Sequence, residues 1–111
     1  MGRGPRPPGE ARRVKPEVVI RPAAEADILV AAEWYASRAP GLGAEFLRAA
    51  DVCFGLIQRH PEGFQVVGGD ARRARLRRFP FSVFYVPTPA RISILAVLHV
   101  RRDPREWQGR L

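Results

Sequence analysis

The residues best suited to chemistry lie in the C-terminal third of the chain, where arginines are concentrated. Residues 71–111 carry ten arginines against two acidic residues. The segment ARRARLRRF at 71–79 alternates, so a strand would place Arg73, Arg75 and Arg77 on one face. Guanidinium groups form forked hydrogen bonds with phosphate and carboxylate. Because such an array repels itself unless an anion compensates it, the pattern predicts an anionic partner.

A histidine stands at the end of the most apolar segment. The run from Ile92 to Leu98 is apolar apart from Ser93, and His99 follows it just before Arg101. An imidazole there could serve as a general acid, because the ordinary pKa of histidine is near neutrality. A half-buried packing histidine with one hydrogen bond is the structural alternative. No second ligand stands at a usable spacing, so we predict neither a metal site nor a cofactor.

The basic ending RRDPREW at 101–107 has two interpretations. Asp103 and Pro104 are a turn-forming pair that can begin a short helix, with Asp103 as the N-cap and Pro104 as the first residue. Trp107 would then pack back on the fold as an anchor, because an apolar ring gains from burial. Alternatively, these residues belong to a partner-binding surface. We predict such a surface from Arg73, Arg75, Arg77, Arg101, Arg102, Arg105 and Trp107.

The chain of 111 residues has a formal charge of +8 that is unevenly distributed. Residues 1–22 hold six basic and two acidic groups, residues 23–70 three and seven, and residues 71–111 ten and two. This segregation predicts a nucleic acid, an acidic peptide or another anionic surface as partner. Eighteen of the nineteen basic residues are arginine, which fits either forked anion recognition or the codon usage of a GC-rich genome.

Composition also bears on where the protein works. The single cysteine, Cys53, cannot form an internal disulfide, as expected in a reducing cytoplasm. No apolar run approaches the ~20 residues of a membrane span, and the basic N-terminus lacks the apolar core of a signal peptide. We therefore expect a cytoplasmic protein that does not associate with membranes. Residues 1–16 predict a disordered, basic, proline- and glycine-rich tail before a single domain at 17–111.

Hydrophobic periodicity predicts the elements that must position these residues. An apolar period of 3.6 predicts helices over 23–38 and 43–59, after which the period changes to that of strands. Alternation in the last strand would place His99 on one face with Leu95 and Val97. We predict strands at 17–21, 64–67, 71–79, 81–86 and 91–100. The result is an α+β fold, with an N-terminal strand and a helical hairpin packed on an antiparallel sheet of about four to five strands.

Four segments together resemble a known family. They are AAEADILVAAEWYASRAPGLGAEFL, IQRHPEGF, RARLRRFPFSVFYV and ILAVLHVRRDPREW. In order and spacing they resemble the RelE/ParE toxins of bacterial type II toxin–antitoxin modules, and in particular the ParE-like or plasmid-stabilisation branch, over residues 18–110. The resemblance implies a toxin that is neutralised by a cognate antitoxin, which is encoded alongside and wraps the toxin with an acidic or amphipathic C-terminal segment.

The resemblance implies two alternative targets. RelE-like members cut mRNA on the ribosome, whereas ParE members poison DNA gyrase and have lost the ribonuclease residues. Cleavage of RNA at its 2′-OH needs a base, cations for the phosphate charge and an acid for the leaving oxygen. RelE-like enzymes supply Lys, Arg and Tyr, and another branch supplies Glu, Arg and a terminal His-Tyr pair.

The sequence lacks a convincing set of these ribonuclease residues. The folded region has no lysine, Val100 follows His99 in place of a tyrosine, and Ser82 stands where many members carry an arginine. If the chain were an mRNA endonuclease, its catalytic candidates would be His99, Arg77 and Arg101. We therefore predict a ParE-like toxin that binds DNA gyrase and has no catalytic site of its own.

Three alternatives stay open at this point. The chain could be a RelE-like, ribosome-dependent mRNA endonuclease. It could be a degenerate, non-toxic member that only binds an antitoxin. It could also be a small basic nucleic-acid-binding domain, and a strong salt dependence of nucleic-acid affinity would favour that alternative.

Overall fold

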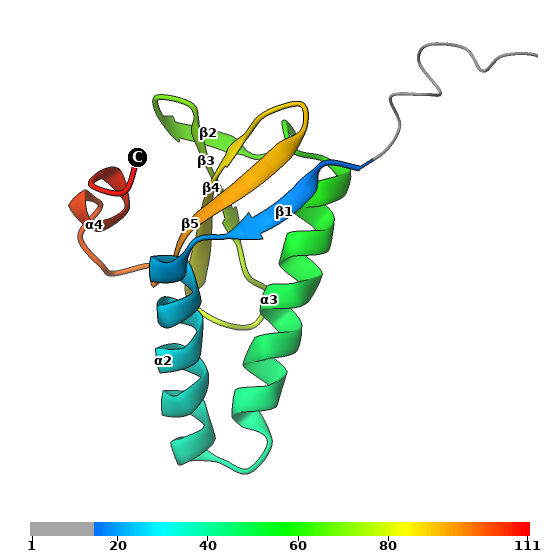
Figure 1. Ribbon diagram of the computed structural model, residues 1–111. Helices are drawn as coiled ribbons and strands as arrows, with labels where there is room; N and C mark the ends of the chain where they lie inside the picture. The colour runs from blue at the N-terminus through cyan, green and yellow to red at the C-terminus, as the bar shows by residue number, and fades with distance from the viewer. Residues whose placement is uncertain (1–14) are drawn as a thin grey trace, which may run out of the picture.

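The computed structural model describes residues 15–111, which form one layer of helices against one sheet (Figure 1). Residues 1–14, and with them most of the predicted tail, lie outside the described residues. The observed order of strand, two helices and four strands is the predicted one, and the α+β class is confirmed. The elements are β1 (Glu17–Ile20), α2 (Pro22–Arg38), α3 (Leu42–Arg59), β2 (Gln65–Gly68), β3 (Ala71–Arg75), β4 (Phe81–Pro87), β5 (Arg91–His99) and α4 (Arg105–Gln108).

The five strands form one mixed sheet in the order β1-β5-β4-β3-β2. The four later strands pair in antiparallel fashion, as predicted. Strand β1 joins the sheet parallel to β5, with Val18 opposite Ile92. Parallel neighbours need a long crossover connection, and here the helical hairpin is part of it. The hairpin therefore covers one face of the sheet, as Figure 1 shows.

The two helices of the hairpin approach closely at a glycine. Pro22 begins α2 at a position where its missing N–H costs nothing, and Gly41 precedes α3 with a φ of 80°. A Cβ atom added to Gly43 would lie 2.6 Å from the backbone oxygen of Ala32 and 2.9 Å from the Cβ of Ala36. The crossing of α2 and α3 therefore has no room for a side chain at this position.

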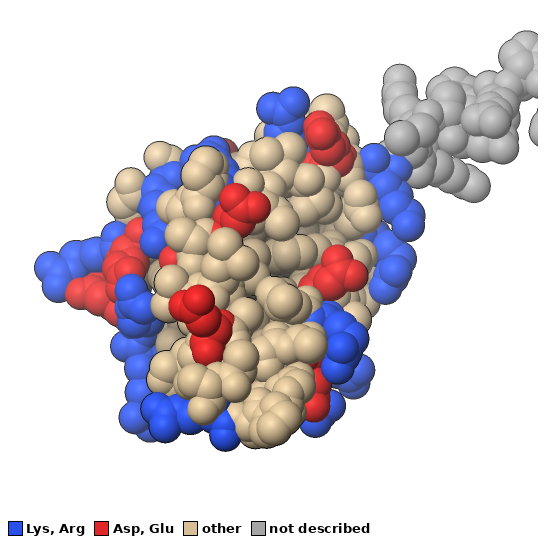
Figure 2. All heavy atoms as spheres, turned by 60° about the horizontal axis from the view of Figure 1, so that its bottom comes forward, with Lys and Arg blue, Asp and Glu red and all other residues tan. Residues whose placement is uncertain are grey.

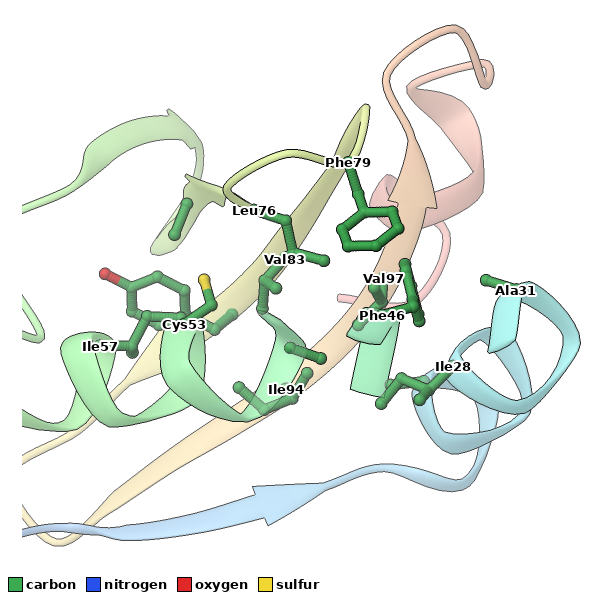
Figure 3. Close-up of a cluster of buried hydrophobic side chains, with 14 of the residues drawn as sticks. Ile28, Ala31, Phe46, Cys53, Ile57, Leu76, Phe79, Val83, Ile94 and Val97 are labelled. Atoms are coloured by element: carbon green, nitrogen blue, oxygen red, sulfur yellow. The ribbon is translucent and has the colours of Figure 1, made fainter. Parts of the chain in front are cut away.

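The main core lies between the hairpin and the sheet and is rich in aromatic rings (Figure 3). Phe46 is fully buried and stacks on Tyr35, with ring centroids 5.5 Å apart. Its ring also meets the edges of Phe79 and Phe81, at centroid distances of 5.3 and 5.0 Å. Aromatic pairs of this kind add about 0.5–1.5 kcal/mol each beyond their area burial. These rings fill the space between the helical hairpin and the face of the sheet that it covers.

A β-bulge in β5 changes which residues face the hairpin. Phe84 pairs with Ala96 while Tyr85 pairs with Ile94, so Leu95 is the extra residue. The predicted grouping of Leu95 with Val97 is therefore wrong. The bulge turns Leu95 to the opposite side, whereas Val97 packs in the helix-side core.

The sheet face opposite the hairpin is here called the open face. Its apolar residues are Ala71, Phe84, Leu95, Ala96 and Leu98, and they form a second cluster with Trp107 of α4. Among residues 15–111, α4 is the one helix that covers this face, and it lies on the other side of the sheet from α2 and α3 in Figure 1.

Strand β3 is shorter than predicted, and this separates the predicted row of arginines. The strand ends at Arg75, so Arg77 does not continue its face. Leu76 and Phe79 both turn into the helix-side core, and Arg78 between them has a φ of 71°. Burial of those two side chains bends the chain away from the sheet, which overrides the alternation seen in the sequence.

Candidate partner-binding groove on the open face

A groove crosses the open face and gathers several of the predicted site residues. Its lining includes Arg73 and Arg75 of β3, His99 at the end of β5, and Arg102 and Trp107 of the C-terminal segment. Phe84 and Leu98 contribute apolar surface, and Ser82 pairs with Leu98 across the ladder. This open-face groove combines an apolar floor with cationic walls.

The cationic wall on β3 is held in place by the neighbouring strand. Arg73 pairs across the ladder with Gln65, and its Nη2 donates to the Gln65 Oε1 at 2.7 Å. Arg72 points elsewhere, because its Nη1 donates to the backbone oxygens of Glu62 and Phe64 at 3.0 and 2.8 Å. Arg72 therefore supports the loop before β2, whereas Arg73 and Arg75 are presented to the groove.

The opposite wall is the C-terminal segment, which Trp107 anchors. The Trp107 ring is buried and stacks on Phe84 with centroids 5.0 Å apart and planes 10° apart. A Cβ added to Gly68 would lie 3.1 Å from the indole, so the absence of a side chain there makes room for the ring. The anchoring role of Trp107 is thus confirmed. Its predicted role in partner binding stays a prediction.

The turn that precedes α4 differs from the predicted cap by one residue. The helix begins at Arg105, with Pro104 in the N-cap position. Asp103 nevertheless performs the capping, because its Oδ1 accepts the Arg105 N–H at 2.9 Å and its backbone oxygen accepts the Glu106 N–H at 3.0 Å. The Arg105 guanidinium also binds this carboxylate and lowers the pKa of Asp103.

His99 lies at the junction between the open-face groove and helix α2. It is half-buried, and its ring meets Phe81 edge-on with centroids 5.4 Å apart. Its Nδ1 accepts the backbone N–H of Arg101 at 3.0 Å, which assigns the proton of the neutral ring to Nε2. This arrangement is the half-buried histidine with one hydrogen bond that the sequence offered as an alternative.

Three of the predicted residues, Arg77, Arg101 and Arg105, do not line the open-face groove. Arg77 lies beside α3, and Arg105 is tied to Asp103. Arg101 is exposed and contributes only its backbone N–H near His99. Arg102 lines the groove but also forms two hydrogen bonds with the Glu106 carboxylate, which raise the pKa of Arg102. The predicted surface is therefore divided: Arg73, Arg75, Arg102 and Trp107 line the groove, whereas Arg77, Arg101 and Arg105 lie outside it.

An ion pair that the sequence did not indicate fastens the chain end to the sheet. Arg110 Nη1 lies 2.6 Å from Asp27 Oδ2, and the side chains are only 24% and 14% exposed. The same carboxylate accepts the Val97 N–H at 3.0 Å, and Arg110 donates to the Leu95 oxygen at 3.1 Å. These contacts provide hydrogen-bond partners for the backbone N–H of Val97 and the backbone oxygen of Leu95, which lie beyond the part of β5 that pairs with β1. No local pattern signals a pair 83 residues apart.

The lining of the open-face groove is cationic and apolar. In the part of the chain that the structure describes, the groove lining contains no aspartate, glutamate, lysine or tyrosine. Residues 15–111 contain no group of three or more His, Cys, Asp or Glu side chains that could hold a metal ion. No helix among these residues is long and apolar enough to cross a membrane.

Comparison with known proteins identifies the fold and the family of this chain. No curated protein matches the sequence. Among solved structures, a protein described as the chromosomal ParDE toxin–antitoxin system from P. aeruginosa superposes with a TM-score of 0.68 at 18% identity, covering 77% of this chain and 96% of that one. At that identity the likeness shows the fold. Residues 18–104 match the family described as the ParE toxin of the type II toxin–antitoxin system parDE. The chain therefore belongs to the ParE toxin family.

Proposed function

We propose that this chain is a toxin that inhibits growth by binding DNA gyrase in the cytoplasm, and that a cognate antitoxin neutralises it. The proposal assigns the open-face groove to protein contact. A gyrase poison needs complementary surface and no acid–base pair of its own. The antitoxin would then act by covering the surface that the target uses.

The observation that carries this proposal is the composition of the groove. Internal cleavage of RNA requires a base for the 2′-OH and an acid for the leaving oxygen. The groove lining supplies cations, a serine and one histidine, without a carboxylate, lysine or tyrosine among its described residues. The His99 Nδ1 atom already accepts the backbone N–H of Arg101. The same lining suits a segment that carries both apolar side chains and carboxylates.

The antitoxin segment would meet two features of the groove. Its carboxylates would form charge-assisted hydrogen bonds with Arg73 and Arg75. Its backbone could pair with β2, which is the outer strand of the sheet and contributes Gln65, Val66 and Val67 to the groove wall. Addition of a strand to an exposed edge is a common mode of peptide recognition.

Induced expression in bacteria tests the target. Growth would be scored together with mRNA cleavage and induction of the DNA-damage response. We expect growth arrest with DNA damage and intact mRNA. Rapid codon-linked mRNA cleavage would contradict the proposal and make His99 the first catalytic candidate. Growth without arrest would indicate a non-toxic member.

Charge reversal tests the groove. The double variant Arg73→Glu, Arg75→Glu should lose growth inhibition and bind the antitoxin at least about tenfold more weakly, because two contacts become repulsive. The matched control is Arg38→Glu, Arg91→Glu, which makes the same change of charge at two exposed arginines outside the groove. Equal behaviour of the two double variants would remove the assignment of the groove.

A further inference from the structure

The segment PEVVIRP at residues 16–22, which contains β1, forms one edge of the sheet. Strand β1 pairs with β5 on one side, and among residues 15–111 no strand pairs with its other side (Figure 1). An edge of this kind leaves backbone N–H and C=O groups available to another chain. The side of β1 that faces away from β5 is here called the β1 edge.

The hydrogen bonds to β5 fix which backbone groups point outward at the β1 edge. The N–H groups of Glu17 and Arg21 donate to backbone oxygens in and just before β5, at 3.0 and 3.1 Å. Because backbone groups alternate in direction along a strand, the N–H and C=O groups of Val18 and Ile20 point away from β5. These two residues are therefore the ones that can pair with an added strand.

One symmetric register lets two copies of β1 pair through both outward residues. With Val19 on a two-fold axis, Val18 of each copy lies opposite Ile20 of the other, and each such pair exchanges two backbone hydrogen bonds. A register centred on Val18 would place Ile20 opposite Pro16, and proline has no N–H to donate. A register centred on Ile20 would place Val18 opposite Pro22, with the same loss. The register centred on Val19 therefore gives the most complete pairing.

The same register is complementary in charge and in apolar side chains. It places Glu17 of each copy opposite Arg21 of the other, at non-hydrogen-bonded positions where facing side chains lie closest. Both side chains are exposed, and the present contact of Glu17 with Arg91 is a long one of 3.8 Å. On the other face of the sheet, Ile20 is 39% exposed and would cover Val18, which packs beside the helix-side core.

Contacts at the two ends of β1 confine the pairing to this short stretch. The Pro16 oxygen already accepts Nε2 of Gln58 at 2.8 Å, and Pro22 begins α2. The Arg21 Nη1 donates to the Arg110 oxygen at 3.1 Å, but a guanidinium has further N–H donors for a carboxylate. The outer strand at the opposite edge, β2, has the sequence QVVG and carries no charge. Self-complementary charge is therefore a property of the β1 edge.

We propose that two copies of this chain associate through the β1 edge as a symmetric dimer that joins their two sheets. Such an interface is isologous, because the same residues of both copies contact each other across the axis. None of residues 16–22 lines the open-face groove, so the association leaves both grooves free. The dimer would present two grooves to its partners. This inference does not depend on the proposed target or on the antitoxin.

The formal charge of +8 opposes self-association at long range. Figure 2 shows acidic side chains among the basic ones on the side of the hairpin turn, so charges of both signs reach the surface. At physiological ionic strength, repulsion between exposed charges more than ~8 Å apart is largely screened, whereas facing side chains of paired strands lie closer than that. A pairing confined to residues 17–21 is small for a protein interface, so we expect a weak dimer that dissociates on dilution.

Sedimentation equilibrium of the full chain over a range of concentrations tests the dimer. Glu17→Arg should weaken dimerisation about tenfold, because symmetry turns both attractive pairs into repulsive ones. Arg21→Glu should have the same effect. The matched controls are Glu33→Arg and Arg38→Glu, which make the same changes of charge at exposed positions of α2 and should leave the dimer unaltered. Thermal unfolding checks that each variant folds.

A mixture of the two edge variants distinguishes the pairing from a general effect of charge. Chains with Glu17→Arg and chains with Arg21→Glu are complementary across the β1 edge, so an equimolar mixture should recover association as a heterodimer. The double variant Glu17→Arg, Arg21→Glu should recover it as a homodimer.

Three results would overturn the proposal. The unaltered chain could remain monomeric up to its solubility limit. A dimer could respond to the edge variants no more than to the controls, which would place the interface on another surface. The mixture and the double variant could fail to recover the association that the single variants had lost, which would exclude the pairing of Glu17 with Arg21.

Discussion

The two faces of the sheet use the same strands for different purposes. On the helix-covered face, the buried ring of Phe46 packs against the rings of Tyr35, Phe79 and Phe81. On the open face, one short helix reaches the sheet through the stacking of Trp107 on Phe84. The arginines of the groove stand beside this thinly covered face. The comparison suggests that stability resides mainly on one face and recognition on the other.

The largest difference between the faces should appear on truncation of a buried ring. Phe46→Ala removes the centre of the aromatic cluster and should lower the free energy of unfolding by about 3–5 kcal/mol. Trp107→Ala should cost about half as much, because α4 can readjust and water can enter the groove. Urea unfolding of both variants measures the two losses. Equal losses would mean that the open face is as tightly built as the other.

A smaller effect is expected where the hairpin helices touch. Gly43→Ala places a methyl group 2.6 Å from a backbone oxygen and should destabilise the fold by about 1–3 kcal/mol. Gly55→Ala on the same helix is the control, since its Cβ would approach only the end of the Arg59 side chain at 4.0 Å. That change should stabilise the helix by about 0.5–1 kcal/mol. If both variants shifted the midpoint of thermal unfolding in the same direction, the close packing at Gly43 would be refuted.

The ion pair at the chain end should matter more than the exposed pair next to it. Arg110→Ala leaves the Asp27 carboxylate without its cation in a half-buried site and should cost about 1–2 kcal/mol. Exchange of the Val97 amide hydrogen should accelerate as the β5 edge loosens. Arg105→Ala removes an exposed partner of Asp103 and should leave unfolding unchanged. If Arg110→Ala left the free energy of unfolding unchanged, Trp107 alone would hold the C-terminal segment on the sheet.

The smallest effect concerns alkaline pH and the helix-covered face. Burial raises the pKa of Cys53 to about 11 and that of Tyr85 to about 12, the latter against the opposing charge of Arg72. A folded pKa above the unfolded one means that stability is complete at neutral pH and declines as pH rises. The decline should begin near pH ~9 and continue through the folded pKa values. Cys53→Ala should flatten the first part of this decline in urea titrations.

The sequence predicted most of the fold because its signals were local. The apolar period placed both helices within one residue of their observed starts at Pro22 and Leu42. The change to a period of two located the strands, although β3 ends earlier than alternation suggested. Local periodicity does not reveal that Leu76 and Phe79 are both drawn into one core, because that depends on side chains of α3.

The candidate site was only partly predictable for the same reason. Arg73 and Arg75 could be assigned to one face because they belong to one strand. Arg77 was misplaced with them, and Leu95 was misplaced with Val97, because a loop and a bulge break the alternation. The Asp27–Arg110 pair joins distant parts of the chain and has no pattern in the sequence.

Hydrogen exchange of the free chain and of its complex with the antitoxin would test the central claim most directly. If the open face is the partner-binding face, the amides of β2 and α4 should gain strong protection in the complex, because one would acquire a neighbouring strand and the other would be covered. The helix-covered core should change little. Unchanged exchange at β2 and α4, with protection confined to other surfaces, would contradict the account.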